Sequence, residues 1–140
     1  MRTRKTFPLL AALVSLSALA QAPGPNWVSL GSVHDRVYLM NRPSLSPIEG
    51  GFAFGVFTDK DEPAPADPLP NGKKYRSSFL NVEVNCGQKS FRIARARFFS
   101  DSRASGSVVA EDQARAGEGW AAAQPDSLGE TFVKAGCAGS

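Results

Sequence analysis

Histidine and cysteine are scarce in this 140-residue chain, which holds one histidine and two cysteines. Zinc and related metal centres are built from clusters of these residues at short spacings. His34, Cys86 and Cys137 lie far apart along the chain and make no such set. We therefore predict neither a metal site nor a cofactor.

The motifs of common catalytic sites are missing as well. No Gly-x-Ser-x-Gly turn is present to expose a nucleophile, and no glycine-rich loop is patterned for phosphate. The one candidate general base is His34, which falls in a short connection between two expected strands. A solvated turn residue is the simpler interpretation of that histidine, so we predict that the protein is not an enzyme.

A hydrophobic run long enough to cross a membrane is also missing, because a spanning helix needs roughly 20 apolar residues. The stretch from Leu9 to Leu19 covers eleven positions and follows three basic residues within the first five. This pattern is typical of a secretory signal peptide. Ala18-Leu19-Ala20 favours cleavage after Ala20, giving a signal peptide over residues 1–20. Cleavage after Ala22 is the alternative, but it would place a proline next to the cut.

An excess of either charge is missing from the rest of the chain. Three of the sixteen basic residues precede residue 20, and all thirteen acidic residues follow it, so residues 21–140 carry thirteen of each. The pI near 9.1 therefore reflects mainly the leader. It is poor support for a nucleic-acid partner, and we expect none.

Export changes the meaning of the two cysteines. In an oxidising compartment an isolated pair most simply forms a disulfide. Cys86 and Cys137 are 51 positions apart, and closing a loop of that size stabilises a fold by about 4 kcal/mol in the entropic model. Free thiols are the alternative; we predict the disulfide.

Apolar alternation and turn residues predict six strands after a short extended arm over residues 21–26. The second strand is expected to end at Met40. A break follows over residues 41–44, because Pro43 cannot donate to a β-ladder, and then a loop over 45–51. The proline-rich segment 59–72 predicts a long loop, either functional or simply mobile. The expected strands are residues 27–31, 36–40, 52–58, 73–86, 89–99 and 105–110.

Residues 75–99 are the expected centre of the fold, with two long strands joined by a turn that begins at Cys86. In the second of these strands Phe91 and Ile93 share a face with Arg95 and Arg97. Regular alternation would then turn two arginines toward the core. A β-bulge near Ala94 would return both to the outer face, and we predict one there.

The last expected element is a helix that begins at Leu128. Ser127 and Glu130 have the spacing of a capping box, and Leu128 and Phe132 fall on one helical face. Gly136 is the expected stop. The predicted fold class is therefore α+β: an antiparallel β-sheet of about six strands with a C-terminal α-helix packed on it and one disulfide, in a single domain over residues 27–140.

Basic residues on the central hairpin form the candidate binding site. In an antiparallel pair the start of one strand lies beside the end of the other, so Arg95 and Arg97 should lie near Lys74 and Arg76. Such a patch would dock an acidic partner; alternatively, the charges keep a strand edge soluble and unpaired. The candidate partner-binding residues are Lys73, Lys74, Arg76, Arg92, Arg95 and Arg97.

Several short motifs occur in a distinctive order: Trp27, Tyr38, Tyr75-Arg76-Ser77, Asn85-Cys86, Phe91-Arg92, Trp120, Gln124-Pro125-Asp126-Ser127 and Cys137. In order and spacing they resemble the surface-adhesin protein E family of Gram-negative bacteria. The resemblance implies a sheet of about six antiparallel strands with a packed helix and one disulfide. For the best-known member it also implies binding of host extracellular-matrix and plasma proteins at the bacterial surface.

The sequence departs from this family in two ways. The best-known member resembles a lipid-anchored protein, but no cysteine follows the leader here, so we expect neither a lipid anchor nor a membrane span. The resemblance also leads us to expect a tryptophan in the third strand, and this sequence has only Phe54 and Phe57 in its place.

The predicted function is that of an exported, adhesin-like binding domain, located in the periplasm or at the cell surface. Its expected partner is a protein or an acidic macromolecule at the cell envelope or on a host surface. The alternative is a soluble periplasmic protein of envelope maintenance or small-ligand binding.

Overall fold

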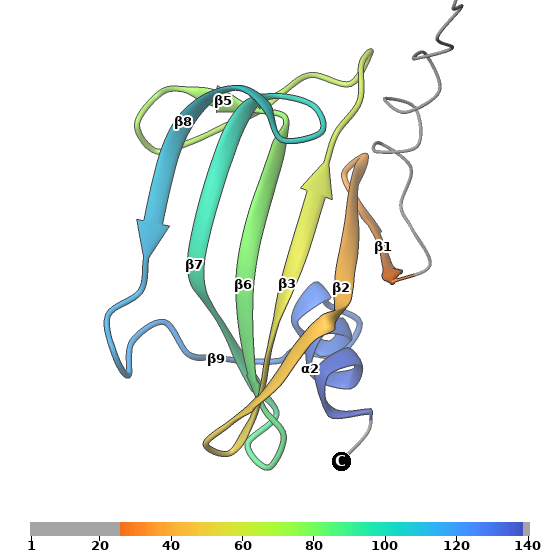
Figure 1. Ribbon diagram of the computed structural model, residues 1–140, viewed down its shortest axis with the longest axis vertical. Coiled ribbons are helices and arrows are strands. Elements are labelled where there is room, and N and C mark those ends of the chain that lie inside the picture. The colour runs from red at the N-terminus through yellow and green to blue at the C-terminus, as the bar shows by residue number, and fades with distance from the viewer. Residues whose placement is uncertain (1–25, 139–140) are drawn as a thin grey trace, which may run out of the picture.

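Antiparallel pairing of strands that follow one another in the chain builds the sheet of this protein (Figure 1). The computed structural model describes residues 26–138, so the expected signal peptide (1–20) and most of the expected arm (21–26) lie outside the described residues. The sheet runs β1-β2-β3-β6-β7-β8. Its strands are β1 (Trp27–Val33), β2 (Arg36–Ile48), β3 (Gly51–Asp59), β6 (Ser77–Asn85), β7 (Ser90–Asp101) and β8 (Ser105–Gln113).

Three short strands and one helix complete the described part of the chain. Strand β9 (Ala121–Ala122) pairs with β7, and β4 (Asp67–Pro68) pairs with β5 (Lys74–Tyr75) in a separate two-stranded sheet. Helix α2 (Leu128–Cys137) follows. The predicted class, an antiparallel sheet of about six strands with a C-terminal helix and one disulfide, is confirmed.

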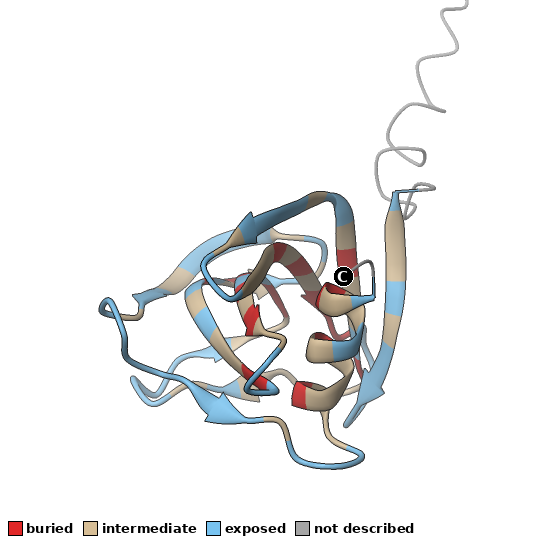
Figure 2. Ribbon diagram, turned by 90° about the horizontal axis from the view of Figure 1, so that it is seen from below, coloured by how far each residue is buried: buried red, intermediate tan, exposed pale blue. Residues whose placement is uncertain are grey.

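The sheet curls into a half-barrel, and α2 lies against its concave side (Figure 2). Strand register places Met40, Val56, Leu80 and Ala96 opposite one another across four strands. All four are buried, and they belong to the same apolar cluster as Phe132 of α2. The helix-covered concave face therefore carries the core.

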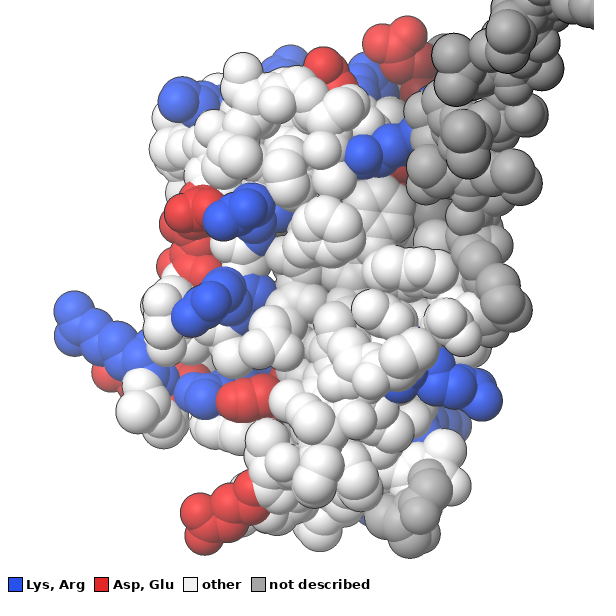
Figure 3. All heavy atoms as spheres, in the orientation of Figure 1, with Lys and Arg blue, Asp and Glu red and all other residues white. Residues whose placement is uncertain are grey.

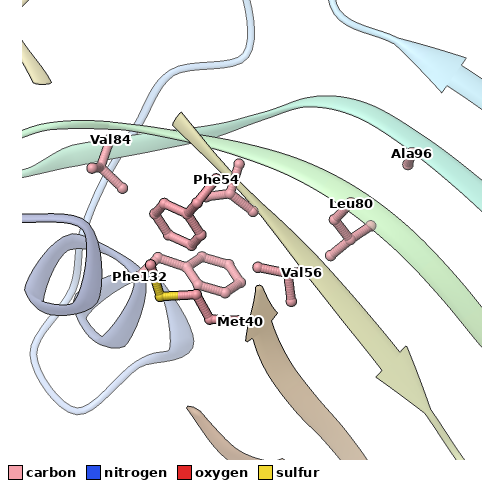
Figure 4. Packing of buried hydrophobic residues seen from close by; sticks show 8 residues of the cluster. Met40, Phe54, Val56, Leu80, Val84, Ala96 and Phe132 are labelled. Carbon is pink, nitrogen blue, oxygen red and sulfur yellow. The ribbon is translucent and has the colours of Figure 1, made fainter. Parts of the chain in front are cut away.

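Phe132 is the centre of the contact between helix and sheet. Its side chain is 1% exposed, and its ring lies 6.3 Å from the ring of Phe54 and 6.0 Å from that of Phe91. Figure 4 shows Phe132 close to Phe54 and Met40, with Ala96 set apart from them. Burying a side chain of this size stabilises a fold by about 1.5–3 kcal/mol, so one residue accounts for much of the docking of α2.

The predicted bulge at Ala94 is present. Arg95 is opposite Asn81 and Ile93 is opposite Val82, so Ala94 has no partner on β6. The extra residue reverses the alternation of β7. As a result, Ile93 lies on the concave face, and Arg95 is on the convex face.

The predicted helix start is confirmed, and the predicted stop is wrong. The Ser127 hydroxyl accepts a hydrogen bond from the Glu130 amide at 3.2 Å, as in the first half of a capping box. Helix α2 continues through Gly136 to Cys137. A Cβ on Gly136 would lie 2.6 Å from Val84 and 2.9 Å from Phe54, so this glycine is required for close packing against the sheet.

The predicted disulfide is confirmed. Cys86 at the β6–β7 turn and Cys137 at the end of α2 are bonded, with their Cα atoms 5.9 Å apart. The bond therefore ties the end of the helix to the corner of the central hairpin.

The prediction that the second strand ends near Pro43 is wrong. Strand β2 continues to Ile48, and its pairing with β3 is interrupted between Asn41 and Ser46 and then resumes. Within the interruption the Ser44 hydroxyl accepts a hydrogen bond from the Gly55 amide at 2.7 Å. A side chain thus satisfies a β3 amide where the backbone ladder is broken, and β2 continues past Pro43.

The strand expected over residues 73–86 is divided in two. Strand β5 ends at Tyr75 and pairs with β4, whereas β6 begins at Ser77. Between them Arg76 directs its side chain to the carbonyl oxygens of Lys60 and Ala64. These contacts, together with the β4–β5 pairing, hold the long 59–72 segment to the rest of the protein.

Candidate functional site

A buried arginine whose guanidinium donors are all hydrogen-bonded lies inside the half-barrel, at the end where β2 begins. Arg36, the first residue of β2, is 3% exposed. Its guanidinium donates to Asp67 Oδ2 at 3.1 and 2.8 Å, and to Thr58 Oγ1 at 3.0 Å. It also donates to the carbonyl oxygens of Arg76 at 2.6 Å and Tyr75 at 3.4 Å. All five guanidinium N–H groups are therefore used within the protein.

Arg36 was missed as a key residue by sequence reasoning, although the sequence contained a signal. Period-two alternation places Arg36 on the same face as Tyr38 and Met40, and that face is the core. A charged residue at a core position requires a partner. The partner, Asp67, lies in the proline-rich segment, 31 residues further along the chain, where no pattern pointed to it.

Asp67 also binds a second buried cation. Lys60, 6% exposed, donates from Nζ to Asp67 Oδ1 at 2.9 Å. Burial acts to raise the pKa of Asp67, but hydrogen bonds from Lys60 and Arg36 outweigh it and hold that pKa below its ordinary value. Burial raises the pKa of the neighbouring Asp59, despite an amide hydrogen bond from Arg103.

Asp67 is expected to make the fold sensitive to acid. An unfolded aspartate has a pKa of about 3.9, and that of folded Asp67 is lower. Its stabilising contribution is therefore fully present above about pH 3.9 and is lost as the pH falls through the folded-state pKa. The contribution of Asp59 to stability has the opposite pH dependence. Because its pKa is raised, Asp59 favours the folded state at low pH, and this contribution is lost as the pH rises.

The Asp67→Asn variant tests this acid dependence. It should be less stable than the wild type at neutral pH but should lose less stability between about pH 4 and pH 2. Urea denaturation at a series of pH values measures the difference, with the exposed Asp61→Asn as the matched control. An acid slope in Asp67→Asn as steep as that of the wild type would contradict the prediction.

Two of the six predicted basic residues are engaged in internal contacts. Besides its bonds to two carbonyl oxygens, Arg76 lies 3.6 Å from Glu62. Arg92 binds both carboxylate oxygens of Glu83 and donates to the carbonyl oxygens of Arg115 and Glu118, each at 3.1 Å. Its guanidinium also covers the Trp120 ring, 5.3 Å from the centroid. Trp120 is thus placed by Arg92 and not by the apolar core.

The other four predicted basic residues are exposed. Arg97 forms a 2.6 Å ion pair with Glu111, and both side chains are more than half exposed; such surface pairs contribute about 0–1 kcal/mol. Arg95 is opposite Asn81 and Gln113 and has no carboxylate partner among residues 26–138. The structure therefore does not gather the six side chains into one patch. The remaining two exposed residues are Lys73 and Lys74 of the β5 region.

An apolar row crosses the convex face, the face that α2 does not cover. The ring of Phe57 lies 6.3 Å from Trp27 and 5.2 Å from Phe79, and Phe79 lies 5.9 Å from Phe99. Val108 of β8 continues the row opposite Phe99. We call these five residues the convex row; they come from five different elements of the sheet and were not predicted as a site.

Two members of the convex row are exposed to solvent. Phe79 is 44% and Val108 48% exposed, Trp27 and Phe57 are half-buried, and Phe99 between Phe79 and Val108 is buried. The outer face of an antiparallel sheet is commonly polar. Figure 3, in the orientation of Figure 1, shows charged side chains along β7 and β8 and an uncharged surface over the middle of β3 and β6. Because large exposed apolar patches mark interaction sites, the convex row is the candidate interaction surface.

Three negative findings apply to residues 26–138. No helix there is long and apolar enough to cross a membrane, and no three His, Cys, Asp or Glu side chains are grouped to hold a metal ion. His34, which was expected to be a solvated turn residue, is exposed in the β1–β2 turn with a positive φ of 49°, and no carboxylate in the same range forms an ion pair with it.

The fold and the exposed face define a small, disulfide-linked α+β half-barrel domain with an apolar stripe on its outer surface. A model of surface-adhesin protein E matches residues 27–138, nearly the whole chain. The chain therefore belongs to the surface-adhesin protein E family, which confirms the resemblance seen in its motifs. Membership implies an adhesin-like protein with an exported or cell-surface location. No match is found among curated proteins.

Proposed function

We propose that this protein is an exported, non-enzymatic adhesin-like domain that binds a protein partner through its convex face. The observation that carries the proposal is the convex row, with its exposed Phe79 and Val108. Aromatic side chains on a rigid sheet can anchor a partner at little entropic cost, because they have few rotatable bonds. Family membership supports a binding role at the cell surface.

The charges beside the row indicate the chemistry of the partner. Arg92 and Arg97 are neutralised by Glu83 and Glu111, whereas Arg95 has no such partner in the described part of the chain. The face therefore offers one uncompensated cation next to an apolar stripe. A protein with exposed apolar side chains and an acidic group complements it.

Replacing Phe79 with alanine is expected to weaken partner binding by at least about tenfold, as loss of a central aromatic anchor does in other interfaces. The measurement is the affinity of the exported, disulfide-bonded protein for a panel of immobilised extracellular-matrix and plasma proteins. The matched control is Leu45→Ala, which truncates another exposed apolar side chain, 37% exposed, on β2.

Both variants should melt within a few degrees of the wild type, because both side chains are substantially exposed. A Phe79→Ala protein that melts normally and binds the partner as tightly as Leu45→Ala would exclude the convex row as the binding surface. Proteolysis of intact cells provides an independent check on location. Protection of the protein in intact cells would exclude surface adhesion and leave the periplasmic alternative.

Replacing Arg95 and Arg97 with serine is expected to reduce affinity for an acidic partner and to flatten its salt dependence, since screening acts mainly on exposed charges. Titrations at two ionic strengths measure the effect. The control is Lys89→Ser with Lys134→Ser, which removes the same charge from exposed positions near α2. An equal dependence of affinity on salt in the two double variants would contradict a role for Arg95 and Arg97 in binding.

A further inference from the structure

The concave face contains a cavity that the core does not fill. Helix α2 covers one end of the half-barrel, and a cavity of about 300 Å³ lies beside it. This volume is at the lower end of the range for small-molecule sites, roughly 300–1,000 Å³. Its floor includes Leu80, Ile93 and Ala96. Ile93 is 41% exposed although it lies on the core face of the sheet, so apolar surface is left uncovered there.

Aromatic rings form two walls of the cavity. Tyr38 and Phe132 make one edge-to-face pair, with ring centroids 6.4 Å apart. Tyr75 and Phe98 make the other, at 4.8 Å, and the Arg36 guanidinium already covers the Tyr75 ring, 4.2 Å from its centroid. Burial is the main reason that the pKa of Tyr38 is raised, so its hydroxyl is neutral near pH 7. Aromatic faces carry negative electrostatic potential and attract cations.

The charged group at the β8 end of the cavity also favours a cation. Arg36 lines the opposite end, where it shares the Asp67 carboxylate with Lys60, but all five of its N–H groups are engaged within the protein, so it has no donor to offer an anionic ligand. Asp112 lines the other end, on β8 opposite Ala96. Its carboxylate accepts a hydrogen bond from the Gln113 amide and forms no ion pair within residues 26–138.

We propose that this cavity is a binding site for a small organic cation with an apolar body, such as an aromatic or alkyl ammonium compound. The apolar body lies on Leu80, Ile93 and Ala96, and Asp112 supplies the counter-charge. The ammonium group approaches the aromatic rings that Arg36 does not cover, those of Tyr38, Phe98 and Phe132. Aromatic enclosures are a general means of recognising ammonium groups. This site is separate from the convex row and does not depend on the function proposed for it.

Three probes that share a benzyl group and differ in charge test the proposal. They are benzyltrimethylammonium, benzyl alcohol and phenylacetate, titrated against the disulfide-bonded protein by calorimetry and by NMR. The cation should bind about fivefold or more tighter than the other two, as expected for one cation–π contact and one exposed counter-charge. Shifted NMR signals should belong to residues of the concave face, such as Ile93 and Phe98.

Neighbouring residues on β8 provide matched variants, because consecutive side chains point to opposite faces of a sheet. Asp112→Asn should remove the preference for the cation and leave benzyl alcohol binding unchanged. Glu111→Gln, one residue away on the convex face, should keep the preference. Ala96→Phe should fill the cavity and abolish binding of all three probes, and Phe79→Ala should change none of them.

Several results would overturn the proposal. These are equal affinity for the three probes, tightest binding of phenylacetate, a cation preference that persists in Asp112→Asn, and no binding of any probe at millimolar concentration. Should Ala96→Phe fail to fold, the comparison of Asp112→Asn with Glu111→Gln still tests the proposal. Both substitutions lie at exposed positions, so both variants should fold.

Discussion

Replacing Arg36 with methionine is expected to lower the free energy of unfolding by about 3–5 kcal/mol, the usual cost of removing one member of a buried ion pair. Methionine fills similar space but donates no hydrogen bonds. Asp67 would lose one of its two cationic partners, and the carbonyl oxygens of Arg76 and Tyr75 would lose a donor. Each buried polar group left without a partner adds to the penalty.

Chemical denaturation of Arg36→Met and Arg42→Met measures this effect. Arg42 is on the same strand but is exposed, so its replacement should change stability by no more than about 0.5 kcal/mol. Arg36→Lys should recover only part of the loss, because an ammonium group has three donors and cannot reproduce the planar fork. Equal unfolding midpoints for Arg36→Met and Arg42→Met would contradict the structural role of this arginine.

Replacing both cysteines with serine is expected to lower the free energy of unfolding by about 4 kcal/mol, because the disulfide closes a loop with a sequence separation of 51 residues. The loop contains β7, β8 and most of α2. Typical domains are stable by only about 5–15 kcal/mol, so the Cys86→Ser, Cys137→Ser protein should unfold at a much lower denaturant concentration.

The reduced wild-type protein should match the double serine variant, which separates loss of the bond from the effect of the substitutions. Alkylation under denaturing, non-reducing conditions should modify neither cysteine of the exported protein. Modification of both sulfurs would contradict the bond, and with it the export to an oxidising compartment from which the bond was predicted. A variant as stable as the oxidised wild type would show that the loop is already restrained without the disulfide.

Local patterns predicted much of the fold because they have local causes. Regular alternation would place Phe91 and Ile93 on the same face as two arginines, and this conflict predicted the bulge at Ala94. The helix start followed from Ser127 and its neighbour three residues on. These features depend on backbone periodicity and capping within a few residues, which a sequence displays directly.

The errors occurred where a distant segment satisfied a local defect. Pro43 removes a donor from β2, but the Ser44 hydroxyl serves a β3 amide and the strand continues. Gly136 was expected to end α2, but its lack of a side chain lets the helix approach Val84 and Phe54. In each case tertiary packing changed the consequence of a residue whose intrinsic preference was correctly recognised.

The sequence predicted a basic patch as the binding site and did not predict the convex row. Sequence alone placed basic residues on the central hairpin, but the structure engages Arg76 and Arg92 in internal bonds. The convex row is assembled from residues far apart in the chain, from Trp27 to Val108, and each of them alone is an ordinary strand residue. Only strand register brings their rings together.

By itself the sequence determined the main strands of the sheet, the C-terminal helix, the bulge, the helix cap and the disulfide pair, because each follows from residue spacing or from the chemistry of two cysteines. Tertiary structure alone decided that Arg36 would be buried against Asp67, that Phe79 and Val108 of the convex row would be exposed and that a cavity would remain beside α2. These features depend on which strands are neighbours and on how far one short helix extends over a curled sheet, and no local pattern contains that information.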